Sequence, residues 1–130
     1  MQEELLRGEG FTARIRWNGR FLRAHVFDGT DSLQVSSEVW CLLSTQCARF
    51  GTQRLLAIEE LVGTVPQEDL PALTAAQMAC GFGDLRIAFV DLHVDVQGNE
   101  TSELLLMEHD VQVKVFNTEA EAERWLLYGL

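Results

Sequence analysis

The chain has 130 residues, 47% of them hydrophobic, and carries a formal net charge of −10 at pH 7. This length and composition predict one globular domain whose core needs neither metals nor disulfides. The charge is uneven, because residues 1–54 carry a net charge of +1 and residues 55–130 carry −11. An acidic surface repels phosphate backbones, so the charge argues against nucleic-acid binding and is explained most simply by solubility.

The cysteines and the first residues predict the compartment. Cys41, Cys47 and Cys80 lack CxxC spacing and are odd in number, so we expect reduced thiols and a cytoplasmic location. We expect no signal peptide, because charged residues are spread through residues 1–20. No apolar run approaches the roughly 18 residues of a membrane-spanning helix. Nothing in the sequence predicts a cofactor.

The N-terminal part of the chain predicts a β-hairpin. Residues 1–8 are charged and short, so we expect a frayed lead-in there. Hydrophobic and polar residues alternate over residues 11–17, which predicts a strand with one buried face. Asn18-Gly19 is well suited to a type I′ turn, and a second strand is expected over residues 20–27.

The longest helical pattern spans residues 33–50. Asp31 or Ser32 can cap its first turn, and Gly51 stands where a left-handed residue often ends a helix. A third strand with an apolar centre is expected over residues 53–60.

The segment after this strand offers two helix starts. Residues 64–67, Thr-Val-Pro-Gln, match a capping box that begins at Thr64. Pro71 weakens a long helix from Thr64, and Asp69 is the alternative cap of a helix over residues 70–79.

The last third of the chain predicts strand, helix, strand and helix in succession. We expect the strands at residues 84–91 and 111–116 and the helices at residues 99–109 and 118–127. Residues 92–98 fit either a continued strand or a loop. Such a succession favours a parallel sheet, because each crossover helix must cover the sheet.

The predicted order of elements is β-β-α-β-α-β-α-β-α, which belongs to the α/β class. We expect a single, mainly parallel sheet with an N-terminal antiparallel hairpin at one side. Right-handed crossovers should place the helices on the sheet, and residues 1–130 form one domain.

The chain closes with a strand, a short acidic turn and an amphipathic helix carrying Trp-Leu. This ending and the predicted order resemble the STAS-like domains of the anti-sigma-factor antagonist type and their bacterial relatives of similar length. The resemblance implies a STAS-like fold and a regulatory or protein-interaction module that is not an enzyme. The matching residues are Val115, Phe116, Glu119, Ala122, Trp125 and Leu126.

The resemblance also points to a position for phosphorylation. In that family, an Asp-x-Ser-Gly loop after the third strand carries a phosphorylatable serine. Here residues 59–64 read Glu-Glu-Leu-Val-Gly-Thr and contain no serine, so the nearest hydroxyl is that of Thr64. Its other interpretation is the helix cap described above.

The stretch Asp91-Leu-His93-Val-Asp95 is the most suggestive of chemistry. If the strand continues, alternation puts Asp91, His93 and Asp95 on one face at the carboxyl end of the sheet. Two carboxylates and an imidazole could then bind a divalent cation or act in acid–base chemistry. The alternative is that they solvate a strand exit and cap a turn. We expect no bound metal, because a fourth ligand is missing.

Several basic side chains on the hairpin indicate a binding surface. Arg14 and Arg16 share a strand face near Arg20 and Arg23, where they could meet an acidic partner or the acidic half of a second copy. The alternative is an edge kept soluble by charge. Trp40 lies off the main stripe of its helix and could be an exposed interface anchor or pack over the hairpin.

Three functions remain open. The first is a non-enzymatic regulatory or protein-interaction module, with a protein partner or a second copy as its ligand. The second is a carrier of a small apolar or lipid-like ligand between sheet and helices. The third is a small enzyme that uses Asp91, His93 and Asp95. Catalysis has little further support, because there is no phosphate loop or nucleophile motif and the cysteines fit a core.

Overall fold

The computed structural model describes residues 2–93 and 95–130. Six strands form one mixed sheet in which spatial order follows chain order. The first two strand pairs are antiparallel and the last three are parallel, so the predicted α/β class and single sheet are confirmed. The strands are β1 (Gln2–Gly8), β2 (Phe11–Trp17), β3 (Leu22–Phe27), β4 (Arg54–Glu59), β5 (Arg86–Asp91) and β6 (Gln112–Phe116).

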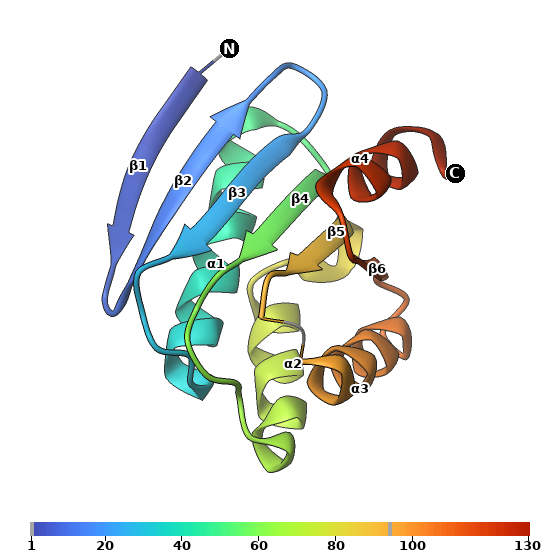
Figure 1. The fold of residues 1–130 in the computed structure, drawn as a ribbon. Helices are drawn as coiled ribbons and strands as arrows, with labels where there is room; N and C mark the ends of the chain where they lie inside the picture. Colours follow the sequence, from blue (N-terminus) through green and yellow to red (C-terminus); the bar gives the residue numbers. More distant parts are fainter. Residues whose placement is uncertain (1, 94) are drawn as a thin grey trace.

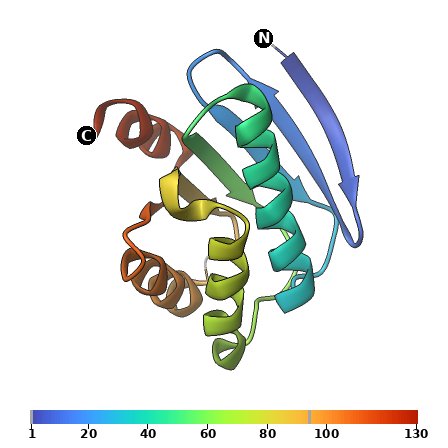
Figure 2. The ribbon, with the colours of Figure 1, turned by 180° about the vertical axis from the view of Figure 1, so that it is seen from behind.

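The helices cover the two faces of the sheet unequally. Each of the three crossovers joins two neighbouring parallel strands, and all three have the same handedness. Helices α1, α2 and α3 therefore lie on one face of the sheet (Figure 2). The last helix, α4, follows β6 and packs on the opposite face over β4, β5 and β6 (Figure 1). The helices are α1 (Leu33–Phe50), α2 (Leu70–Ala79), α3 (Val96–Met107) and α4 (Glu119–Tyr128), with short 3-10 turns η1 (Gln67–Asp69) and η2 (Phe82–Asp84).

Alternation along the strands produces two cores. In β4, Leu55 and Ala57 pack under α1, while Leu56 and Ile58 face α4. On the α4 side, Ala122 and Leu126 are buried as their helical spacing predicts. The same alternation decides whether the last side chain of each strand points toward the helices.

The tryptophan of α4 is only partly buried. Trp125 packs against the ring of Phe116 at 5.6 Å between centroids. The guanidinium of Arg86 lies 3.8 Å from the centre of the Trp125 ring and donates to its backbone carbonyl. Trp125 therefore closes the edge of this core rather than filling its centre.

Several predicted helix ends are confirmed. The Ser32 side chain accepts a hydrogen bond from the backbone of Val35, and Gly51 ends α1 with φ of 66°. The Thr118 hydroxyl accepts from the backbone of Glu121, as the capping box predicts. The second helix occupies residues 70–79, with Asp69 at its cap position but without a side-chain hydrogen bond.

Three local predictions were wrong. The expected frayed lead-in is strand β1, which pairs along its length with β2. The hairpin loop spans residues 18–21 rather than two residues, because the Asn18 side chain accepts hydrogen bonds from the backbones of Arg20 and Phe21. The third helix starts at Val96, capped by Asp95, whereas we expected its start at Asn99.

The cysteine prediction also needs correction. Cys41 on α1 and Cys80 after α2 form a disulfide, although the odd count predicted reduced thiols. Cys47 is free and buried, and desolvation raises the pKa of its thiol to about 12, in keeping with a core residue. The cytoplasmic location rested on reduced thiols and stays a prediction. Across the described residues, no helix is long and apolar enough to cross a membrane.

Candidate functional site

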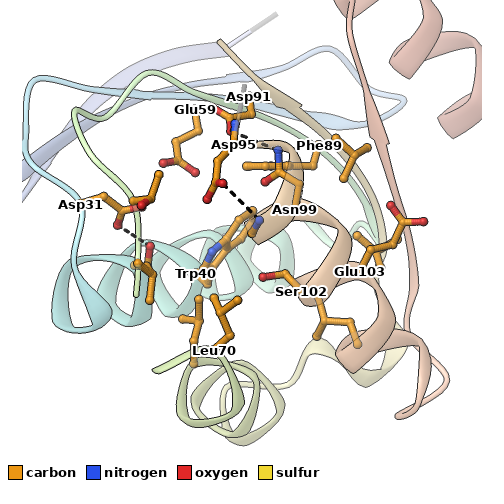
Figure 3. A pocket seen from close by; sticks show the side chains of 18 of the residues that line it. Asp31, Trp40, Glu59, Leu70, Phe89, Asp91, Asp95, Asn99, Ser102 and Glu103 are labelled. Atoms are coloured by element: carbon orange, nitrogen blue, oxygen red, sulfur yellow. Dashed lines mark hydrogen bonds between the residues drawn. The ribbon is translucent and has the colours of Figure 1, made fainter. Parts of the chain in front are cut away.

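A pocket lies between the sheet and helices α1, α2 and α3 (Figure 3). Its volume is about 80 Å³. Four acidic side chains gather at one end, near the carboxyl ends of β4 and β5, and Glu103 lies apart from them (Figure 3). The four are Asp31, Glu59, Asp91 and Asp95.

Strand alternation explains why carboxylates reach this pocket. Glu59 ends β4 two residues after Ala57, which faces the helices, so its side chain points to the same face. Asp91 ends β5 two residues after Phe89 in the same way. The register pairs Glu59 with Asp91, which places the two carboxyl groups on neighbouring strands.

Asp31 joins this end of the pocket from the loop after β3. Its Oδ1 accepts hydrogen bonds from the backbone of Ser32 at 2.8 Å and from the Ser36 hydroxyl at 2.6 Å. Two backbone hydrogen bonds between residues 29–31 and Val62 hold this loop beside the segment that follows β4. The side chain of Asp31 is thus held by the start of α1, and its backbone is held by the segment after β4.

Asp91 and Asp95 mainly organise the backbone. Asp91 accepts from the backbone of His93 at 3.0 Å, from the backbone of Asp95 at 2.9 Å and from the side-chain amide of Asn99 at 3.1 Å. Asp95 accepts from the backbone of Gly98 and caps α3. These contacts match the alternative in which the stretch caps a turn, while His93 is exposed. Strand β5 ends at Asp91, and residue 94 lies outside the described residues.

The arrangement does not form a recognisable metal centre. Over residues 2–93 and 95–130, no three His, Cys, Asp or Glu side chains are grouped so that they could hold a metal ion. The hydrogen bonds above occupy both oxygens of Asp91. The absence of metal binding at Asp91, His93 and Asp95 stays a prediction.

The electrostatics single out Glu59. Desolvation, followed by repulsion from Asp31 and Asp91, raises the pKa of Glu59 to about 9. Desolvation also raises the pKa of Asp31, against the hydrogen bond from Ser36. Glu59 therefore carries a proton at neutral pH. No lysine or arginine is among the described residues that line the pocket, so this acidic end has no counter-ion.

Much of the remaining wall is apolar and is formed by residues of the helices, the strands and the turns between them. Trp40 on α1 lies between Phe82 and Phe89, with 5.6 Å between its ring centroid and each of theirs. The remaining apolar wall residues are Val65, Leu70, Leu73, Ile87, Leu106, Val113 and Val115.

One buried amide also lines this wall. Gln77 on α2 is 4% exposed. Among the described residues, no fully buried side-chain nitrogen or oxygen lacks a hydrogen-bond partner, so Gln77 only adds a polar group to this wall.

The predicted partner-binding residues lie elsewhere. Arg14 and Arg16 share the sheet face opposite α1, where Arg16 pairs with Glu3 and Arg14 lies over the ring of Phe27. The other two hairpin arginines contact α4: Arg20 bonds the Tyr128 hydroxyl, and Arg23 pairs with Glu119.

Two further predictions change in this structure. Trp40 was expected at an exposed interface or over the hairpin, but it packs into the pocket wall, because its neighbours Phe82 and Phe89 approach from η2 and β5. Thr64 is not a helix cap, since the helix begins later, and it lies exposed at the pocket rim. Its modification stays a prediction.

Sequence reasoning missed Asp31, Glu59 and Gln77 as site residues. The available signal was the acidic residue that follows each buried strand: Asp31 comes four residues after β3, and Glu59 and Asp91 end β4 and β5. Carboxyl ends of adjacent parallel strands meet at one edge of the sheet. Gln77 gave no signal, because a glutamine within a helix is normally exposed.

Comparison of the chain with known protein families, curated proteins and solved structures gives no match. The resemblance to STAS-like domains therefore stays a prediction, and the structure has one more N-terminal strand than the predicted order of elements.

Proposed function

We propose that this protein binds a small ligand in the pocket between the sheet and helices α1, α2 and α3, without transforming it. The observation that carries the proposal is a preformed pocket whose apolar wall leads to an acidic end with no counter-ion. This is the carrier function considered from the sequence, with a ligand that is polar at one end.

The contacts at the acidic end favour binding over catalysis. Asp91 and Asp95 are engaged by backbone N–H groups that hold the turn and the start of α3. Exposed His93 contributes its backbone N–H to this network. A general base needs a free carboxylate or imidazole within reach of the substrate. Both oxygens of Asp91 already accept hydrogen bonds, so its carboxylate is not free.

Two measurements test ligand binding. Native mass spectrometry of the purified protein should show a non-covalent adduct that is lost on denaturation. Ser102→Phe, which places a ring in the pocket from α3, should abolish the adduct, whereas the exposed Gln97→Phe on the same helix should retain it. An adduct retained by Ser102→Phe would place the ligand outside the pocket.

A second candidate function is the regulatory or protein-interaction module. The observation that favours it is an open surface on the sheet. Strands β1, β2 and β3 have one face opposite α1, and helix α4 does not cover this face (Figure 1). This face carries exposed Arg14 and partly exposed Arg16 and Phe27. A second copy could dock there through its acidic half.

A further inference from the structure

We propose that the ligand is a small primary amine, held as its ammonium ion by Asp31 and Glu59 with its alkyl part against Trp40 and the apolar wall. This inference rests on the proposed function, because it names the chemistry of a ligand for the same pocket. Figure 3 shows Asp31 and Glu59 at the same end of the pocket as Trp40.

The charges around the pocket select a cation. Asp31, Glu59, Asp91 and Asp95 all line it, and no lysine or arginine of the described chain does so. The acidic side chains would repel an anion there. An ammonium group would be attracted to these acids, and charge-assisted hydrogen bonds of this kind are the strong ones.

The wall next to these acids selects an organic cation. Trp40 and Phe89 present aromatic rings beside the acidic end, and aromatic faces attract ammonium groups. A hydrated metal ion would gain nothing from an apolar wall, and the described residues offer no cluster of metal ligands. An alkylammonium ion satisfies the carboxylates and the apolar wall together.

The size of the cavity limits the ligand. The cavity volume of about 80 Å³ is roughly half that of an engineered cavity of about 150 Å³ that binds benzene. The ligand, or the end that enters, is therefore short.

Protonation of Glu59 gives binding a characteristic pH dependence. Desolvation and then repulsion from Asp31, Asp91 and Asp95 raise the pKa of Glu59, and His93 lines the same pocket. Because Glu59 is protonated at neutral pH, an ammonium ion that pairs with its carboxylate must displace this proton. Affinity should rise with pH between about 6 and 9, by up to about tenfold per unit, while the amine remains protonated.

The test compares three probes of the same length: n-butylamine, n-butanol and butyrate. Each is titrated into the full chain at pH 7, and the indole signal of Trp40 is followed by NMR, with Trp17 outside the pocket as an internal control. Butylamine should bind at least tenfold more tightly than butanol, and butyrate should not bind. Glu59→Gln should weaken butylamine at least tenfold and leave butanol unchanged.

Glu60→Gln is the matched control variant. Glu60 follows Glu59 but pairs with His25 and does not line the pocket, so this variant should bind butylamine like the wild type. Equal binding of butanol and butylamine, or unchanged butylamine binding in Glu59→Gln, would overturn the amine assignment and leave the proposed function standing. Failure of all three probes to perturb Trp40 would instead overturn the proposed function.

Discussion

At the scale of single residues, Glu59 is the side chain whose surroundings most disfavour its usual charged form. Strand alternation turns it toward the helices, and the register places it next to Asp91. Since desolvation and two neighbouring acids favour its protonated form, the charged form costs stability. A carboxyl group kept in such a position is more consistent with a binding role than with a structural one.

The raised pKa of Glu59 predicts how stability depends on pH. The pKa of Glu59 is about 9 in the folded state against an ordinary value of 4.5, so between these two pH values the folded state binds one proton more than the unfolded state. Stability should fall as pH rises through this window, by up to about 1.4 kcal/mol per unit. Glu59→Gln, which mimics the protonated form, should remove this slope in urea denaturation from pH 5 to 9.

Glu60→Gln should retain the slope, because Glu60 is exposed and lies outside the pocket. A wild-type stability that stays level from pH 5 to 9 would contradict the raised pKa. Both variants should fold, since glutamine has nearly the size and shape of a protonated glutamate.

The sequence predicted these side chains only in part. Asp91, His93 and Asp95 drew attention because they are close in sequence, but the structure uses Asp91 and Asp95 to hold the backbone. Asp31 and Glu59 lie 28 positions apart, and only the pairing of strands brings them together. A pattern within one segment cannot reveal a pair made by tertiary structure.

At the scale of elements, the disulfide between α1 and the end of α2 is a cross-link close to the pocket. Cys41 follows Trp40 directly, and the Ser44 hydroxyl donates to the backbone carbonyl of Cys80. The two cysteines are separated by 39 positions. A cross-link of this span restricts the unfolded chain and holds two of the helices that line the pocket.

Removing this cross-link should lower stability. For a closed loop of this length, the loss of unfolded-state entropy corresponds to about 4 kcal/mol. The double variant Cys41→Ser, Cys80→Ser should therefore show a clearly lower urea midpoint, and Cys47→Ala serves as a control that keeps the cross-link. An intact mass that counts three thiols, with no effect of reductant on the midpoint, would restore the expectation of reduced cysteines.

Elements with strong periodicity and caps were predicted well, and elements without them were not. The helix from Leu33 has a serine cap and a closing glycine, and α4 has a full capping box. Strand β1 has no alternation, because Leu5 and Leu6 are adjacent among charged residues. It forms because β2 offers an unpaired edge, and a partner of this kind is not visible in the sequence of β1.

At the scale of the whole molecule, the order of the sheet decides which surfaces are left free. Three crossovers of one hand place three helices on one face, so the other face depends on α4 alone. That helix covers β4, β5 and β6, and the antiparallel strands remain open on this side (Figure 1). The uncovered face lies in the nearly neutral half of the chain, and the strongly acidic half supplies α2, α3 and α4.

This division of charge predicts salt-sensitive self-association. Arg14 is exposed on the uncovered face beside Phe27, and Leu5 on β1 is 48% exposed. Trp40 supplies no apolar area, because it lines the pocket. Exposed ion pairs contribute little individually, so the expected dimer is weak and forms only at high protein concentration and low ionic strength.

Light scattering at low and high salt measures this association. Arg14→Glu should abolish it, while Arg124→Glu, the same charge reversal at an exposed position of α4, should leave it nearly unchanged. Arg16 is already paired with Glu3, so Arg16→Glu should have the smaller effect of the two hairpin variants. Equal losses in Arg14→Glu and Arg124→Glu would mean that net charge alone governs association. A monomer mass at both salt concentrations would leave the uncovered face to a different protein partner.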